Sequence, residues 1–400
     1  MGLQIQGPEW FEDIAVPVSA GVITPQELLT QKEIRKNKWV WGLLVEATFH
    51  VRAATGAATP LTYLPEFPFG FIDRFRIEGN HYDFGVREFF NVSGPTLAAL
   101  ANFFQLRPMS ALVKFNAGTA YQSGYSAKTG IGLPGQILAT NPTIASSANN
   151  DYDVQVWYLI PFVPLGIPVE QQALFMLRGD SWETLNFHCN VADGSGLFDN
   201  KTGTTVTFGA FGSGTGAVAG QPLIRVHLLR PNMGLARNKY KPALVWRTFQ
   251  GGATLATPLT AANLTDGLIA RLTVVPDKYL RFLVKTGLKT TDTPTAGVNA
   301  AFTGLTDGIV TRPKVKLSGK LVRNPIDIGT HKEWQMVAHG STQPVGYHLV
   351  DLIETGDVNT FFSVKGLTKD DFTYEGDVVA AANQIGEILE ERVEQQPVAV

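Results

Sequence analysis

Apolar side chains recur at every second position in several segments of this chain, and this alternation constrains its fold more than any other feature. The clearest example lies within residues 39–52, where the alternating apolar side chains are Trp39, Trp41, Leu43, Val45, Ala47, Phe49 and Val51. Successive side chains of a β-strand point to opposite faces of its sheet, so this segment is predicted to be a strand with one buried and one wet face. The same pattern returns in the segments 71–78, 112–115, 154–162, 224–228, 268–274, 280–284 and 315–321. The sequence therefore predicts an all-β protein built from antiparallel sheets.

Two short helices are expected among the strands, one in each half of the chain. Residues 93–95 carry a Ser-Gly-Pro start for the first helix, and Thr330 with Glu333 predicts a capping box at the start of the second. Both halves therefore follow the order strands, helix, strands, which is a repeat of architecture and not of residues. A turn-rich segment around Asn232 separates the halves. Three regions are predicted: an N-terminal arm over residues 1–37, a first β-sandwich over 38–231, and a second β-sandwich with the C-terminal segment over 232–400.

The two ends of the chain carry weaker signals. Trp10, Phe11 and Ile14 lie at positions i, i+1 and i+4 of a short helical turn expected near the N-terminus. Three large apolar side chains in an otherwise polar tail need a partner, which is either their own domain or a neighbouring molecule. Residues 24–27 are expected to begin a short helix, while residues 385–395 fit either a helix or a strand.

Charge and cysteine content exclude several classes of protein. The formal net charge is −2, which lacks the basic excess that phosphate binding requires, so direct nucleic-acid binding is not expected. The single cysteine, Cys189, excludes an internal disulfide framework and every multi-thiolate metal site. No apolar run reaches the length of about 18 residues that suggests a membrane-spanning helix. The N-terminus lacks the basic region of a signal peptide, so export through such a signal is not expected. A myristoylation motif would have Ser or Thr where Gln6 stands, so lipidation is not expected either.

No combination of residues predicts a catalytic, metal or cofactor site. The seven histidines include no H-E-x-x-H motif and no pair four residues apart, and no G-x-S-x-G motif occurs. Gly212 and Gly214 with Ala217 resemble part of a dinucleotide-binding loop, but residues 217–222 cannot supply the helix that must follow. We therefore expect no enzymatic activity, no catalytic residue, no metal and no cofactor.

A row of lysines lies in the second half of the chain, where Lys314, Lys316 and Lys320 alternate with apolar residues. Lysines on an exposed or edge strand block unwanted pairing with other chains, which is the simpler interpretation of this pattern. The alternative is a positive face that binds an acidic neighbour. The candidate assembly contacts predicted from the sequence are therefore Trp10, Phe11, Ile14, Lys314, Lys316 and Lys320.

Segments in both halves share their order and local sequence with one known family. They are residues 41–48, 154–164 and 183–187 in the first half, and residues 277–282, the helix around Trp334, and the strands near Tyr347 and Val378 in the second. In this order they resemble the double jelly-roll major capsid proteins of tailless icosahedral bacteriophages with an internal membrane, the tectivirus-like lineage. The resemblance covers residues 38–395.

The resemblance implies an all-β double jelly roll, that is, two eight-stranded antiparallel β-sandwiches with one short helix inserted in each. It further implies a homotrimeric, pseudo-hexagonal tile in the capsid shell of a virion around an internal membrane, after synthesis in the host cytoplasm. The implied partners are other copies of the chain, minor capsid or vertex proteins, and the surface of the internal membrane. Near-neutral charge agrees with a tile that is present in many copies. Family members often carry a longer polar N-terminal helix, from which this proline-bearing N-terminus departs.

Two other functions remain open from the sequence. A carbohydrate-binding or glycoside-cleaving β-sandwich would stack exposed indole rings on sugars, and the candidates are Trp39, Trp41, Trp157 and Trp182. The alternation places Trp39 and Trp41 on the same face as Leu43 and Val45, which favours a place in the core. A phage spike or minor vertex protein is the third interpretation.

Overall fold

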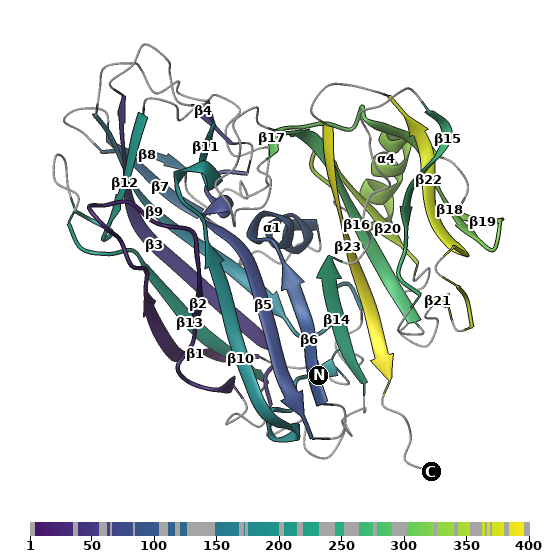
Figure 1. Cartoon of the computed structure of the whole chain (residues 1–400), viewed down its shortest axis with the longest axis horizontal. Helices are drawn as coiled ribbons and strands as arrows, with labels where there is room; N and C mark the ends of the chain where they lie inside the picture. The colour runs from purple at the N-terminus through teal and green to yellow at the C-terminus, as the bar shows by residue number, and fades with distance from the viewer. Residues whose placement is uncertain are drawn as a thin grey trace.

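Two β-sandwiches lie side by side in the computed structural model, and a short α-helix accompanies each (Figure 1). The structure describes residues 5–34, 39–55, 62–64, 66–82, 85–103, 111–116, 121–125, 149–167, 172, 175–199, 204–213, 219–231, 245–251, 264–274, 278–289, 302–323, 326–339, 343–352, 362–364, 366–368, 370–379 and 384–395. Most elements within these residues are strands, which confirms the prediction of an all-β protein.

The first sandwich consists of two facing sheets. One sheet has seven strands, in the order β1 (Ile5–Ala15), β13 (Leu223–Pro231), β3 (Gly42–Thr55), β9 (Asn149–Pro161), β7 (Ala111–Asn116) and β8 (Tyr121–Tyr125), with β12 (Thr204–Gly209) paired to β3. The facing strands are β2 (Gln26–Leu29), β10 (Trp182–Val191), β5 (Ile72–His81) and β6 (Gly85–Val92). Helix α1 (Gly94–Phe103) follows β6, and the short strands β4 (Thr62–Tyr63) and β11 (Phe198–Asp199) pair with each other.

The second sandwich repeats this plan. One sheet has the order β14 (Val245–Gly251), β23 (Gln384–Gln395), β16 (Lys278–Lys289) and β20 (Tyr347–Asp351), and β17 (Phe302–Leu305) and β21 (Phe362–Ser363) also pair with β16. The facing sheet has the order β15 (Leu264–Arg271), β22 (Phe372–Val378), β18 (Val310–Leu317) and β19 (Lys320–Arg323). Helix α4 (Ile328–His339) follows β19.

The strands of both sandwiches follow one topology. The eight strands common to the two are β1, β2, β3, β5, β6, β9, β10 and β13 in the first, and β14, β15, β16, β18, β19, β20, β22 and β23 in the second. When these are numbered in chain order, one sheet of each sandwich reads 1-8-3-6, the facing sheet reads 2-7-4-5, and the helix follows strand 5. This strand order is that of a jelly roll. The predicted double jelly roll, with one short helix in each half, is therefore confirmed.

A shared sheet joins the two jelly rolls. Strand β6 of the first pairs in parallel with β14 of the second, with Phe90 opposite Phe249 and Asn91 opposite Gln250. The result is a ten-stranded sheet that passes from β10 and β5 through β6 to β14 and β23 (Figure 1). Backbone hydrogen bonds therefore hold the two rolls beside each other.

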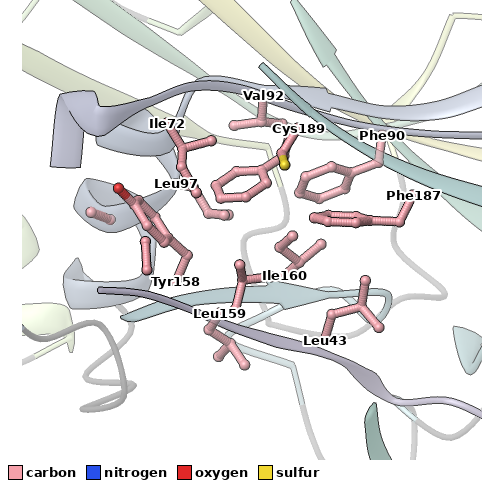
Figure 2. Packing of buried hydrophobic residues seen from close by; sticks show 14 of the residues in the cluster. Leu43, Ile72, Phe90, Val92, Leu97, Tyr158, Leu159, Ile160, Phe187 and Cys189 are labelled. Atoms are coloured by element: carbon pink, nitrogen blue, oxygen red, sulfur yellow. The ribbon is translucent and has the colours of Figure 1, made fainter. Parts of the chain in front are cut away.

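The hydrophobic core of the first roll lies between its two sheets and α1. The rings of Phe49 and Phe71 stack with centroids 4.0 Å apart, and the hydroxyl of Tyr158 donates a hydrogen bond to the Phe69 carbonyl at 2.9 Å. Figure 2 shows Tyr158 and Cys189 among the aromatic and aliphatic side chains that fill this space. Side chains of the second roll belong to the same cluster, namely Leu283, Tyr347, Leu349 and Leu389. The core thus continues across the junction, and each fully buried large side chain contributes about 1.5–3 kcal/mol.

The N-terminus forms two strands of the first jelly roll, contrary to its prediction. Residues 5–15 form β1 rather than a helical turn, and the helix expected to begin at residues 24–27 is replaced by strand β2. Residues 5–15 and 26–29, which lie within the N-terminal arm predicted over residues 1–37, thus pair with strands β13 and β10 of the first jelly roll. Residues 385–395, which fit either a helix or a strand, lie in β23. The boundary expected near Asn232 lies outside the described residues.

Two β-bulges explain why the sequence of β1 shows no clean alternation. One bulge lies between Gln6 and Glu9, and the other lies between Trp10 and Glu12. A bulge adds a residue to one strand and shifts the side chains beyond it relative to the pleat. Phe11 and Glu12 are consequently both buried although they are neighbours, and the apolar spacing imitates that of a helix.

Both predicted helices exist, with one correction. The hydroxyl of Ser93 accepts a hydrogen bond from the backbone N–H of Thr96 at 3.3 Å, so α1 begins where the sequence predicts. In α4 the backbone N–H of Thr330 donates to the carboxylate of Asp327 at 3.2 Å. The capping box predicted at Thr330 and Glu333 is therefore wrong, because Asp327 starts the helix three residues earlier.

Candidate assembly surface

The three predicted lysines do not form one surface. Lys314 and Lys316 lie on β18, and their Nζ atoms are 3.8 and 2.6 Å from Oε2 of Glu375 on β22. Lys314 is buried, since a bulge that includes Arg312 (φ 49°) redirects the strand. Lys320 is exposed at the start of β19. Two of the lysines therefore neutralise a carboxylate of their own sheet, and only the third faces outward.

The three predicted apolar contacts also divide. Phe11 and Ile14 are buried in the core of the first roll, whereas Trp10 lies on the other side of β1 and is 56% exposed. The indole N–H of Trp10 donates to Oδ1 of Asp13 at 3.0 Å, and Nζ of Lys32 lies 4.2 Å from the ring centroid. Two of the three side chains thus cover their own domain. Trp10 is presented on the surface with its orientation held by polar neighbours.

A buried ion pair connects the two jelly rolls beside α1. Oε1 of Glu66, in the first roll, lies 2.5 Å from Nζ of Lys285 on β16 of the second. The hydroxyl of Tyr347 on β20 donates to the same carboxylate. Burial, and after it the charge of Glu66, raises the pKa of Tyr347 well above its ordinary value, so the tyrosine remains a hydrogen-bond donor. All three side chains are buried, and the loss of either charged side chain would leave the other charge without its partner.

A second buried contact lies in the same junction. Nε of Arg281 on β16 is 3.1 Å from Oε2 of Glu391 on β23, and its Nη2 donates to the carbonyl of Leu165 in the first roll at 2.8 Å. Charged hydrogen bonds of this kind have strong geometric preferences. The junction is therefore polar as well as apolar. The sequence carries no signal for these contacts, because their members lie far apart along the chain.

The two helices occupy equivalent places in their rolls but differ in exposure. The buried residues of α1 include Thr96, Leu97, Ala98, Ala99 and Leu100. Helix α4 instead buries Lys332 and Gln335, while Trp334 is 56% and Val337 is 86% exposed. The ammonium of Lys332 lies 2.7 Å from both carboxylate oxygens of Asp307, and Gln335 donates to a backbone carbonyl of β20 at 3.0 Å. Polar side chains thus attach α4 to its roll together with the buried Ile328, while Trp334, Met336 and Val337 are exposed.

A cavity of about 270 Å³ lies between α4 and the strands β18 and β20. Trp334 lines one side, and a hydrogen-bonded row lines another: Nδ1 of His331 is 3.1 Å from Nε2 of His348, whose Nδ1 is 3.0 Å from the hydroxyl of Tyr374. Burial, followed by the proximity of His331 and a lysine, holds the pKa of His348 well below its ordinary value. His348 is therefore neutral at pH 7 and takes part in a structural network. No motif spacing relates these residues, so the sequence does not reveal the row.

The thiol and a second buried histidine also have structural surroundings. Burial raises the pKa of Cys189 to about 12, so the thiol is protonated at neutral pH. Nδ1 of His50 lies 2.8 Å from Oδ1 of Asp153, which also accepts from the backbone N–H of Gly212 at 2.9 Å. Within the described part of the chain, no three His, Cys, Asp or Glu side chains are placed to hold a metal ion. The helices described here are all too short or too polar to cross a membrane.

The tryptophans proposed as sugar-stacking groups are only partly accessible. Trp41 and Trp182 are buried in the core of the first roll, which excludes them as stacking platforms. Trp39 and Trp157 are half-buried, and the guanidinium of Arg178 lies 5.5 Å from the ring centroid of Trp39. The structure thus removes two of the four candidates.

No protein-family model and no curated protein matches this chain. Solved structures match almost its whole length. An atomic structure of Sulfolobus Turreted Icosahedral Virus has a TM-score of 0.57 at 12% sequence identity, over 98% of this chain and 91% of that chain. The crystal structure of the STIV major capsid protein has a TM-score of 0.53 at 12% identity, over 99% and 97%. The Faustovirus major capsid protein has a TM-score of 0.50 at 8% identity, over 98% and 90%.

These similarities concern the whole double jelly roll rather than one of its sandwiches, since each match spans nearly the full chain. At such low identity the likeness is one of fold. The chain is thus a double jelly-roll protein, and its architecture is the one found in these viral structures.

Proposed function

We propose that this chain is a major capsid protein of a tailless icosahedral bacteriophage, and that three copies form a pseudo-hexagonal tile of the shell. The observation that carries this proposal is the pair of jelly rolls with equal topology, joined side by side by one sheet. Two similar units in each chain allow three chains to arrange six similar units around one axis, which suits a hexagonal lattice. The solved structures with this fold come from a virus particle and from capsid proteins, which supports the same role.

In this proposal the tile lies in the shell of a virion around an internal membrane and is made in the host cytoplasm. Its main partner is another copy of the chain, and minor capsid or vertex proteins and the membrane surface are further partners. The formal net charge of −2 supports the role, because many copies can lie close together without strong mutual repulsion. Among the described residues, the buried thiol and histidines make structural contacts, and the role requires no catalysis.

The test is the mass and shape of the purified full-length chain. Sedimentation velocity at micromolar concentration should give the mass of three chains, and negative-stain electron microscopy should show particles with a hexagonal outline. A stable monomer that binds sugars on a glycan array would contradict the proposal and support the carbohydrate-binding alternative. An elongated trimer without that outline would instead support a spike.

A further inference from the structure

We propose that the cavity beside α4 binds a small, uncharged aromatic molecule that carries an N–H or O–H hydrogen-bond donor. The cavity has a volume of about 270 Å³ and lies between the two sheets of the second roll, with α4 along one side (Figure 1). It meets the surface beside Trp334 and Ile326, which are 56% and 43% exposed. This inference goes beyond the proposed function and makes no use of the tile, so either can fail without the other.

The equivalent space in the first roll is filled by side chains of the chain itself. Strands β5 and β9 and helix α1 there correspond to β18, β20 and α4. Leu97 and Leu100 of α1 are fully buried in one cluster with Phe75 of β5. Tyr158 of β9 belongs to the same cluster, and Figure 2 shows it with Leu97. Because protein interiors are closely packed and large voids are few, a cavity at only one of these two places indicates room for another molecule.

A buried amide in the lining of the cavity lacks a hydrogen-bond donor. Gln335 of α4 is 2% exposed, and its Nε2 donates to the carbonyl of Leu349 at 3.0 Å. Among the described residues, Oε1 of Gln335 has no hydrogen-bond partner. A buried acceptor without a partner destabilises the folded state, and most such groups in proteins are satisfied. A ligand with an N–H or O–H group in the cavity would satisfy this oxygen.

The rest of the lining suits a small ligand without charge. Pockets for small molecules typically have volumes of about 300–1,000 Å³ and combine mostly apolar walls with a few polar groups. Here Lys314 and Asp351 carry opposite charges, so the lining does not favour a ligand of either sign. The apolar members of the lining are Pro313, Val315, Val322, Ile326, Leu349 and Val350.

Trp334 favours an aromatic ligand over an aliphatic one. Its ring lies where the cavity meets the surface, and the ring of His331 stacks on it with centroids 5.9 Å apart and 27° between the planes. This contact holds the indole ring in one orientation. Aromatic rings attract each other in offset-stacked and edge-to-face arrangements, so a flat ligand gains a specific contact at this position.

The first test compares two probes, indole and 1-benzofuran, on the purified full-length chain. The two compounds have fused rings of similar shape, but 1-benzofuran has an oxygen atom in place of the N–H donor of indole. Isothermal titration calorimetry at pH 7 should show one indole bound per chain. The affinity for 1-benzofuran should be about tenfold lower, because it leaves Oε1 of Gln335 without a donor. Equal affinities, or no binding of indole at millimolar concentration because water alone fills the cavity, would overturn the inference.

The second test locates the bound indole with Val322→Phe, and Leu321→Phe is its matched control. Val322 of β19 is half-buried and lines the cavity, so the larger side chain fills part of the space and should lower the affinity for indole by about tenfold or more. Leu321 precedes it on the same strand, is 51% exposed and is not part of the lining, so the control should bind indole as the wild type does. Circular dichroism should be unchanged in both variants. Unchanged indole binding in V322F would overturn the inference.

The third test uses Gln335→Met, which removes the acceptor and keeps the length of the side chain. This variant should bind indole and 1-benzofuran with equal affinity. A purely structural role of Gln335 would change both affinities alike and leave the preference for indole, and that result would overturn the inference. None of these outcomes concerns the mass or the outline of the particle, so the proposed function is tested separately.

Discussion

Helices α1 and α4 each follow the fifth strand of a jelly roll, yet α1 is buried between the two rolls and α4 has an exposed outer face. The buried helix is made of small and aliphatic residues such as Ala98 and Leu100, while the exposed helix turns Lys332 inward and Val337 outward. The difference shows that the topology of the roll fixes the position of its helix, whereas the burial of the helix depends on whether a second roll lies against it. The exposed apolar side chains of α4 therefore belong to a helix whose counterpart in the first roll, α1, is covered by the second roll.

The largest difference between the two helices should arise from the polar contacts beside them. Glu66→Gln beside α1 removes the charge that balances Lys285, which is buried, and we expect a loss of about 3–5 kcal/mol in the free energy of unfolding. Asp307→Asn beside α4 weakens the pair with the buried Lys332, and because Asp307 itself is partly exposed the change should cost only about 1–2 kcal/mol. Urea unfolding of both variants measures this. Equal losses would show that the junction is not the more strongly coupled site.

Truncation of one apolar side chain in each helix tests the same comparison. Leu100→Ala in α1 deletes a fully buried side chain and should cost about 2–5 kcal/mol. Val337→Ala in α4 changes an exposed position and should alter the stability of the single chain by less than about 0.5 kcal/mol. Thermal unfolding of dilute, monomeric samples distinguishes the two. A large loss for Val337→Ala under these conditions would mean that α4 is covered within its own chain.

The same comparison shows how far the sequence predicts this protein. The alternation at Leu43, Val45 and Ala47 predicts strand β3, and the Ser93 signal predicts the start of α1, because both depend on local spacing alone. The bulges of β1 break that spacing, so this strand is not recognised. The exposure of Trp334 cannot be predicted either, since an apolar residue in a helix ordinarily indicates burial.

The polar contacts of the junction and of the cavity are the second group that the sequence does not reveal. Glu66 meets Lys285, and His331 meets His348, only because distant strands and a helix are brought together by the fold. Of the assembly contacts predicted from the sequence, Trp10 and Lys320 lie outward, while Phe11 belongs to the core. Local pattern therefore identifies elements, and the three-dimensional arrangement decides which side chains remain for partners.

Acid should lower the stability of the folded chain through His348, which lies beside α4. The pKa of folded His348 is held well below the value of about 6.5 for an exposed histidine. As the pH falls through that value, the unfolded chain gains a proton that the folded chain does not, so stability falls by up to about 1.4 kcal/mol per pH unit. Unfolding at pH 7 and at pH 5.5 measures the slope, and His348→Gln should reduce it. An unchanged slope in that variant would assign the acid sensitivity to other groups.

Small effects are also expected at the starts of the two helices. Ser93→Ala removes the hydroxyl that accepts from Thr96 in α1, and Asp327→Ala removes the carboxylate that accepts from Thr330 in α4. Each change should cost about 1 kcal/mol. Because Ser93 is buried and Asp327 is exposed, the α1 variant should lose more, as measured by urea unfolding. The reverse order would indicate that the start of α4 is more tightly held than its exposure suggests.

The ten-stranded sheet has a consequence for how this architecture persists while sequences diverge. Neighbouring strands of a sheet are rotated relative to each other by about 20–25°, so the pairing of β6 with β14 sets the orientation of one roll against the other. Main-chain N–H and C=O groups, which every residue except proline possesses, make that pairing. Substitutions of exposed side chains therefore leave the pairing that sets this orientation unchanged. The backbone pairing thus preserves the relative orientation of the two rolls, while surface residues can change during evolution.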